Sequence, residues 1–327
     1  MAKPMVVVTR AVPREALDLL SGHCTVDANR ADVGYTREEL ISHARNADAI
    51  VSLLTDRVDD AIFAAAPKLK VVANVAVGYD NVDVAAAVRH RIVVTNTPGV
   101  LTDATADFAW ALILAVTRHV VAADRYVREG RFREWMMMEF HGAELSGRVL
   151  GIAGFGRIGQ AVARRGRGFG MHVVYAGPRR VAQAIEDELG AHYVDKETLL
   201  GSSDVLSLHV PLVPATRHYL GAPEFALMKQ SAFVINTARG PVIDEAALAR
   251  ALAEGAIRGA GIDVFEREPA VDPALLAAPN TVLAPHIGSA TAETRTKMAL
   301  MAAENVIAVL AGRPAVNPVT SFERAQD

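Results

Sequence analysis

Three polar side chains in the second half of the chain each follow a run of strand-forming residues. Arg239 follows residues 233–236, Glu268 follows 261–264, and His286 follows 281–284. Reduction of a ketone by hydride needs a proton donor at the oxygen and a cation for a neighbouring carboxylate. Each residue alone has a structural explanation: a helix cap, a loop charge, a histidine after a proline. Their order in one chain favours catalysis, because parallel strands place their carboxyl ends at one edge of the sheet.

A glycine-rich turn, Gly154-x-Gly156-x-x-Gly159, lies upstream of these residues. It leaves the apolar run 149–153 and opens a helical pattern, the context that makes an otherwise weak motif typical of dinucleotide sites. Gly154 suits a tight turn, Gly156 lets a pyrophosphate approach the backbone, and Gly159 allows close packing of helix and strand. The alternative is a merely tight strand–helix turn.

The next expected strand ends without the acid that would accept a hydrogen bond from the ribose 2′-hydroxyl of NAD. No Asp or Glu occurs between Gly159 and Glu186, and the strand is followed by Arg179 and Arg180. Guanidinium groups suit a 2′-phosphate, so we expect NADP(H) to be preferred, with NAD(H) possible as well. The alternative is that both arginines are ordinary surface charges.

Short β-branched runs alternate with helix-length segments throughout, which predicts α/β domains with doubly wound parallel sheets. The expected strands are 5–9, 50–54, 71–75 and 92–95 in a first series and 149–153, 173–175, 205–209, 233–236, 261–264 and 281–284 in a second. A long helix is expected from Thr102 towards Gly130. A last helix over 290–310 is expected to return to the first domain. Without a long linker, the two domains should face each other across a cleft.

Composition narrows the class of protein. The chain has 327 residues, 51% of them hydrophobic, which predicts about two domains. A net charge of -3 gives no basic field for nucleic acid or acidic lipid. Cys24 is the only cysteine, which excludes an internal disulfide and a Cys-based zinc cluster, and we expect no metal. No apolar run approaches the ~20 residues of a membrane span. We expect a cytoplasmic protein without a nucleic-acid or membrane partner.

With these motifs the sequence resembles the D-isomer-specific 2-hydroxyacid dehydrogenase family over nearly its whole length. The resemblance implies a flavodoxin-like substrate domain of residues 1–99 plus 291–327 and a Rossmann cofactor domain of residues 100–290. It also implies a homodimer built largely on the cofactor domain. In such enzymes the residue matching Arg239 binds carboxylate and carbonyl, His286 is the acid/base, and Glu268 hydrogen-bonds the histidine.

The same resemblance implies the remaining site residues. The cofactor would contact Thr105, Gly154, Phe155, Gly156, Arg157, Ile158, Gly159, Arg179, Arg180, Val210, Pro211, Thr237, Ala238, Arg239, Asp263, His286 and Gly288. The substrate would contact Leu53, Val77, Gly78, Arg239 and His286, with residues 74–83 forming the loop for its carboxylate.

Small differences within the family favour the glyoxylate/hydroxypyruvate reductases. Leu53 lies where phosphoglycerate dehydrogenases tend to place an Arg against substrate phosphate. The expected activity is therefore reduction of small 2-keto acids to 2-hydroxy acids. The alternatives are a broader D-2-hydroxyacid dehydrogenase, a phosphoglycerate dehydrogenase-like enzyme, and a non-enzymatic dinucleotide sensor similar to the C-terminal-binding corepressors.

The Trp135–Met138 run is interpreted as packing at the dimer interface. The alternative is that Trp135 reaches into the active site of the neighbouring subunit.

Overall fold

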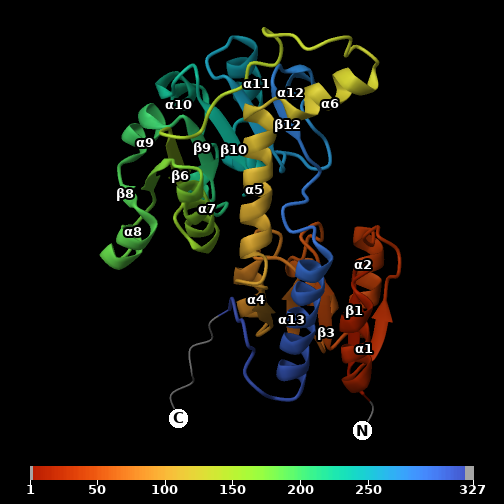
Figure 1. Ribbon diagram of the computed structural model, residues 1–327. Coiled ribbons are helices and arrows are strands. Elements are labelled where there is room, and N and C mark those ends of the chain that lie inside the picture. Colours follow the sequence, from red (N-terminus) through yellow and green to blue (C-terminus); the bar gives the residue numbers. More distant parts are fainter. Residues whose placement is uncertain (1–2, 321–327) are drawn as a thin grey trace. The chain divides into compact units, whose positions relative to one another are not determined.

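The short apolar strands build two separate parallel sheets, each at the centre of its own unit (Figure 1). The computed structural model describes residues 3–320. One unit combines the described parts of Met1–Leu101 and Ala290–Asp327, and the other is Thr102–Ser289. The prediction of an α/β fold with two parallel-sheet domains is confirmed.

The sheet of the first unit has five strands in the flavodoxin-like order β2-β1-β3-β4-β5. The strands are β1 (Met5–Val8), β2 (Thr25–Ala28), β3 (Ala49–Ser52), β4 (Val71–Asn74) and β5 (Val93–Thr95). The helices are α1 (Arg14–His23), α2 (Arg37–Ala44), α3 (Asp60–Ala65), α4 (Val84–Arg89) and α13 (Ala292–Leu310).

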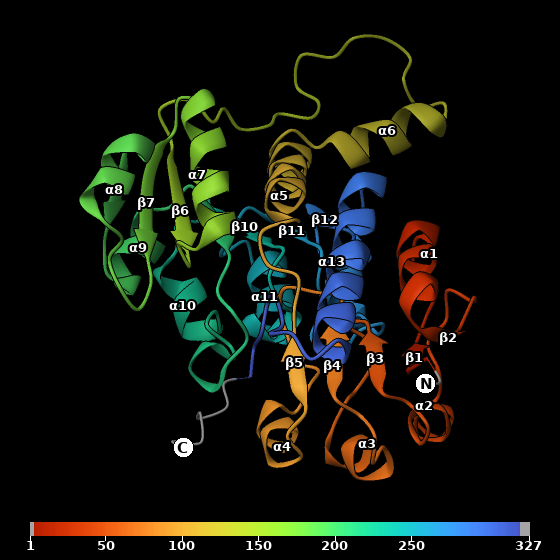
Figure 2. The same cartoon turned by 90° about the horizontal axis from the view of Figure 1, so that it is seen from below.

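Alternate strand residues divide the core of this unit between two faces of the sheet. Val7, Ile50 and Val72 pack under α2, α3 and α4 on one face. On the other face α13 packs against α1 and β4, so the last helix returns to the first unit as expected (Figure 2).

The sheet of the second unit has seven strands in the order β12-β11-β10-β9-β6-β7-β8. They are β6 (Val149–Ala153), β7 (His172–Ala176), β8 (Ala191–Tyr193), β9 (Val205–Leu208), β10 (Phe233–Asn236), β11 (Gly259–Ile262) and β12 (Thr281–Leu283). The α-helices are α5 (Thr102–Thr117), α6 (Val120–Arg128), α7 (Arg157–Gly168), α8 (Gln183–Leu189), α9 (Lys196–Ser202), α10 (Ala222–Leu227), α11 (Glu245–Ala253) and α12 (Pro273–Ala277), with short 3-10 turns at Pro214–Thr216 and Gly240–Val242.

This is the Rossmann order, with one strand added after the sixth. Helices α5 and α7 bury their apolar sides on one face of the sheet, and α9, α10 and α11 cover the other. The strand order reverses between β6 and β9, where a dinucleotide binds in folds of this type.

The long helix expected from Thr102 towards Gly130 is interrupted. Helix α5 ends at Thr117 and α6 begins at Val120, because His119 takes the left-handed backbone conformation with φ of 54°. Two short edge strands, β2 and β8, were also absent from the expected series. Within residues 3–320 no single helix has the length and composition of a membrane span; α5 and α6 meet that test only as a pair bent by 62°.

Candidate active site

The catalytic candidates lie at one edge of the seven-stranded sheet because of its register. Asn236 of β10 is paired with Ile262 of β11, and Ile262 with Leu283 of β12. The three parallel strands therefore end level with one another, and the segments that follow them begin side by side. Those segments carry Arg239, Glu268 and His286.

Glu268 and His286 are in direct contact. His286 Nδ1 lies 2.9 Å from Glu268 Oε2, and the other carboxylate oxygen accepts a hydrogen bond from Phe265 N at 3.0 Å. Burial opposes the ionisation of Glu268, but the hydrogen bond and charge of His286 outweigh it and lower its pKa, with Arg239 adding to the effect. Glu268 is thus held as a carboxylate, and the contact leaves His286 Nε2 for a substrate.

His286 sits in a constrained turn. Its backbone has a φ of 56°, a left-handed conformation that is uncommon for residues other than glycine. Asp263, which is 1% exposed, stabilises this turn through three acceptors. Its carbonyl oxygen accepts from His286 N at 2.8 Å, and its carboxylate accepts from Ile287 N at 2.7 Å and Gly288 N at 2.8 Å. The backbone turn that carries His286 is therefore held by a buried acid.

The segment with Arg239 is shaped by Asn236, a buried residue that sequence reasoning gave no role. Its amide donates to Arg239 O and its carbonyl accepts from Ala238 N, both at 3.0 Å. Next to it, a Cβ on Gly240 would lie 1.8 Å from Phe265 O. The backbone after Arg239 can approach the backbone before Glu268 only because residue 240 is glycine.

The glycine-rich turn has the geometry expected of a dinucleotide loop. Gly154 has a φ of 89°, and a Cβ there would lie 2.7 Å from the carbonyl of His209. A Cβ on Gly156, by contrast, would have no described atom within 4 Å, and no side chain caps the helix that begins at Arg157. The open space and the uncapped N–H groups suit a pyrophosphate.

Further positions agree with a nicotinamide dinucleotide beyond the glycine turn. Thr237 Oγ1 is buried and has no hydrogen-bond partner among the described residues, so it is available to a bound group. Thr105 is 5% exposed and lies beside Gly288, where a Cβ would be 3.6 Å from its methyl group. Val210 is buried and Pro211 exposed, just after β9. These residues all belong to the second unit.

The loop after β7 places its two arginines differently. Arg180 forms a two-pronged ion pair with Glu186, through Nε at 2.9 Å and Nη2 at 2.6 Å. Glu186 is 3% exposed and also accepts from Tyr175 Oη at 2.7 Å, and these bonds lower the pKa of Glu186 to about 2. Arg179 is exposed and has no ion-pair partner among residues 3–320. Sequence reasoning noted Glu186 only as the next acid along the chain.

The substrate candidates of the first unit lie in two loops at the carboxyl edge of its own sheet. Asp56 accepts from Leu53 N at 2.7 Å and from the Thr9 hydroxyl. Asn81 donates to Leu53 O at 3.0 Å and is bonded to Asn74. Asn74 in turn donates to Gly78 O at 3.0 Å. A continuous network thus holds Leu53 and the Val77–Gly78 turn together.

Comparison with known proteins settles the family. The family model for the D-isomer specific 2-hydroxyacid dehydrogenase NAD binding domain matches residues 110–288. The chain belongs to this family. A glyoxylate reductase of Korarchaeum cryptofilum is 51% identical to this dehydrogenase, over 95% of this chain and 94% of its own. A glyoxylate reductase of Thermococcus litoralis is 49% identical, over 95% of each chain.

A solved structure agrees with these relatives. The NADPH-dependent glyoxylate/hydroxypyruvate reductase of Sinorhizobium meliloti, in complex with NADP and malonate, has a TM-score of 0.86 at 34% identity. The match covers 98% of this chain and 97% of that one. The D-2-hydroxyacid dehydrogenase described here is therefore an oxidoreductase with a nicotinamide dinucleotide cofactor, and the predicted family and enzyme class are confirmed.

Proposed function

We propose that this dehydrogenase reduces glyoxylate and hydroxypyruvate to the corresponding 2-hydroxy acids, with NADPH preferred over NADH. The observation that carries the proposal is the Glu268–His286 contact of 2.9 Å on the strand-end edge that also bears Arg239. The names of the relatives from Korarchaeum cryptofilum and Thermococcus litoralis support glyoxylate as substrate. Leu53, without charge, supports a substrate that has no phosphate.

In this proposal the second unit, from about residue 100 to 290, binds the cofactor. Its pyrophosphate contacts would come from Gly154, Phe155, Gly156, Arg157, Ile158 and Gly159. The nicotinamide half would lie against Thr105, Val210, Pro211, Thr237, Ala238, Arg239, Asp263, His286 and Gly288. Arg179, supported by Arg180, would bind the 2′-phosphate. The first unit would bind the substrate through Leu53, Val77 and Gly78.

The proposed reduction follows from the charge or proton that each of three side chains carries. Arg239 binds the substrate carboxylate and orients the ketone, since its guanidinium always carries a charge. The bound cofactor supplies a hydride for the carbonyl carbon. His286 donates the proton from Nε2 to the carbonyl oxygen as the negative charge develops there. Glu268, ionised and bonded to Nδ1, stabilises the imidazolium before transfer and fixes the plane of the ring.

Two statements about the molecule in the cell complete the proposal. We place it in the cytoplasm, where the free thiol of Cys24 would stay reduced. We also propose that it acts as a homodimer through the apolar surface formed by α6 and the loop after it.

A substrate panel tests this function. Glyoxylate, hydroxypyruvate, pyruvate and 3-phosphohydroxypyruvate are compared for kcat/KM with NADPH and with NADH, by absorbance of the reduced cofactor. The first two substrates with NADPH should give the highest values. A phosphorylated substrate ranking first would contradict the substrate assignment, and a higher value with NADH would contradict the cofactor assignment.

The matched inactive control is His286→Asn, because asparagine tolerates the left-handed backbone at this position better than alanine does. It keeps the turn and removes the proton donor. Its turnover should fall roughly 100- to 10,000-fold, the usual range for a positioned acid. Unchanged turnover would remove His286 from the mechanism.

A further inference from the structure

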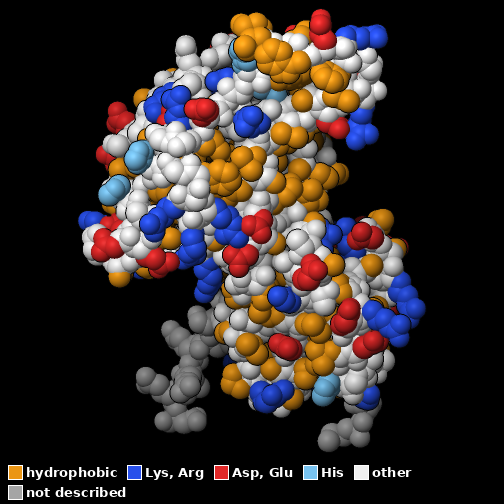
Figure 3. Space-filling model, viewed as in Figure 1, with side chains coloured by type: hydrophobic (Ala, Val, Ile, Leu, Met, Phe, Trp, Pro, Cys, Tyr) orange, Lys and Arg blue, Asp and Glu red, His pale blue; other side chains and the backbone are white. Residues whose placement is uncertain are grey.

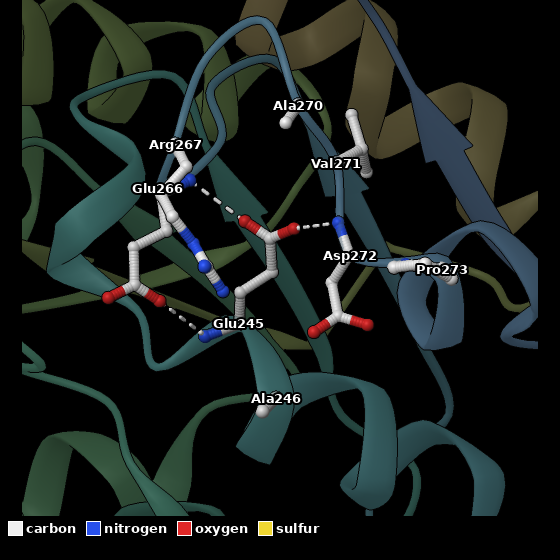
Figure 4. A pocket seen from close by; sticks show the side chains of 8 residues that line it. All are labelled: Glu245, Ala246, Glu266, Arg267, Ala270, Val271, Asp272 and Pro273. Atoms are coloured by element: carbon white, nitrogen blue, oxygen red, sulfur yellow. Dashed lines mark hydrogen bonds between the residues drawn. The ribbon is translucent and has the colours of Figure 1, made fainter.

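A single buried carboxylate holds both ends of the loop that carries Glu268. Glu245, the first residue of α11, is 8% exposed. Its Oε2 accepts from Glu266 N at 2.8 Å, and its Oε1 accepts from Asp272 N at 2.6 Å (Figure 4). Both oxygens point to the loop, so residues 267–271 are closed into a ring by one side chain. Hydrogen bonds to an ionised acceptor are about twice as strong as neutral ones.

The Glu266 side chain adds contacts at the first end of the loop: its carboxylate lies 2.8 Å from His218 Nε2 and accepts from Glu245 N at 3.4 Å. A cavity of about 370 Å³ lies beside the loop and is lined by Glu245, Ala246, Glu266, Arg267 and residues 270–273 (Figure 4). Within the ring, Ala270 N donates to Arg267 O at 2.9 Å, so the segment folds back on itself. Because side-chain packing is incomplete at a cavity, the two bonds to Glu245 matter here: they fix the backbone N–H groups at both ends of the loop.

The position of Glu268 depends on that order. One of its oxygens accepts from the backbone N of Phe265, the residue just before Glu266, and the other contacts His286 Nδ1 at 2.9 Å. If Glu266 N and Asp272 N lost their common acceptor, the backbone between them would relax towards the cavity. The Glu268 carboxylate would then meet the ring nitrogen at a longer distance or a poorer angle.

We propose that Glu245 is a positioning residue for the reduction, acting through Glu268. Its carboxylate holds the ends of the 266–272 loop so that Glu268 stays bonded to His286. The inference rests on the proposed role of His286 as proton donor. Charged groups lie near both contacts. Asp263 and Arg239 lie near Glu268 and His286, and Glu266, Arg267 and Asp272 surround Glu245. His218 and Arg217 contact the Glu266 carboxylate.

The first test is Glu245→Gln, which keeps the size of the side chain. An amide can accept from only one of the two N–H groups and turns its own NH2 towards the other. The turnover of reduction should fall about tenfold, as for a lost charge-assisted bond. The falling limb of the pH profile for reduction should move to lower pH, because a weaker contact with the Glu268 carboxylate stabilises the imidazolium of His286 less. Glu268→Gln removes that charge and should move the limb in the same direction.

A double-mutant cycle separates this role from general loss of stability. If Glu245 acts only through Glu268, the double variant should be no slower than Glu268→Gln alone. Losses that multiply, or a Glu245→Gln profile superimposable on that of the wild type, would overturn the proposal. Asp244→Ala is the control, because it removes the side-chain cap of α11, at 2.9 Å from Ala247 N, and leaves the loop bonds intact. It should lower the melting temperature and leave the pH profile in place.

A second pair of variants tests the loop side of the same bond. Asp272 has a φ of -59°, which suits proline, so Asp272→Pro removes the N–H without strain at that residue. Asp272→Ala keeps the N–H and loses only the cap of α12. The proline variant should reproduce the loss and pH shift of Glu245→Gln while the alanine variant does not. Equal behaviour of the two would count against the proposal.

All variants are compared on whichever 2-keto acid the wild type reduces best. A wrong substrate or cofactor assignment therefore leaves this test intact. If the wild-type profile for reduction has no falling limb, the proposed acid role of His286 fails before any variant is compared.

Discussion

Asp263 shows how one buried residue can hold the turn that carries His286 at a cost in stability. It accepts three hydrogen bonds from the His286–Gly288 turn, yet burial raises its pKa to about 6 against an ordinary value of 3.8. The N–H groups of Ile287 and Gly288 and the charge of His286 oppose this rise and do not cancel it. The native state therefore binds this proton more tightly than the unfolded chain does.

The sign of the pH dependence follows from linkage. The stabilisation by protonated Asp263 is complete below its unfolded pKa near 3.8 and is lost as the pH rises through about 6. The free energy of unfolding of wild type relative to Asp263→Asn should fall by about 2 kcal/mol between pH 4 and pH 7, because asparagine does not titrate. Urea denaturation of both proteins at several pH values measures this difference. A difference that is independent of pH would contradict the raised pKa.

At the scale of elements, the connection between β7 and α8 separates two arginines that look equivalent in sequence. Glu186 and Gln183 hold Arg180 through three hydrogen bonds, whereas Arg179 is exposed. A 2′-phosphate near this loop would interact with the unneutralised charge of Arg179. The charge of Arg180 is already partly neutralised by Glu186, so its interaction with the phosphate would be weaker.

We therefore expect Arg179→Ala to lower kcat/KM for NADPH by more than tenfold, the size of a charge-assisted contact, and to leave NADH almost unaffected. Arg180→Ala should have the smaller effect on NADPH and the larger effect on melting temperature, because it leaves Glu186 buried without its cation. Arg164→Ala is the control, since Arg164 is an exposed arginine of α7 and is paired with Glu188 of α8. Equal losses with both cofactors would show that Arg179 does not bind the phosphate.

Sequence patterns predict these elements well where strands are buried and poorly at sheet edges. Strands β6 and β10 have the predicted bounds, since both are apolar runs between turn signals. Strand β2 was missed because its residues are half-buried or exposed and include Asp27, as an edge strand allows. The break after α5 has no Gly or Pro to announce it, because His119 itself takes the left-handed conformation.

The candidate site shows the same division between local and long-range signals. The glycine turn and the order of Arg239, Glu268 and His286 are visible in sequence because each follows a strand. The residues that hold this site in place cannot be recognised in the sequence. Asn236, Glu186 and Glu245 act on backbone or side chains brought near by folding, and in sequence they are indistinguishable from a strand-end amide and helix acids. Only the register and the loop geometry reveal them.

At the scale of the molecule, the surface of the second unit carries an unusual concentration of apolar side chains. Helix α6 and the loop after it expose Val127 (57%), Phe132 (61%), Trp135 (74%), Met137 (67%) and Met138 (78%). Figure 3 shows hydrophobic side chains gathered over this region. Monomeric proteins rarely expose apolar patches larger than a few hundred Å². Aromatic residues and methionine are also enriched at protein interfaces.

We expect this surface to form the interface of a homodimer. Sedimentation of the wild type at micromolar concentration should give a dimer, and the double variant Trp135→Asp with Met138→Asp should give a monomer, because two carboxylates would be desolvated in each copy of the interface. Val33→Asp is the matched control: Val33 is 71% exposed but belongs to the first unit, outside the patch, and its variant should remain dimeric. The circular dichroism of all three proteins should coincide, so that a monomer can be attributed to the interface and not to unfolding. A wild-type monomer would contradict the homodimer itself. A double variant that stays dimeric would place the interface elsewhere and leave Trp135 and Met138 without a partner to explain their exposure.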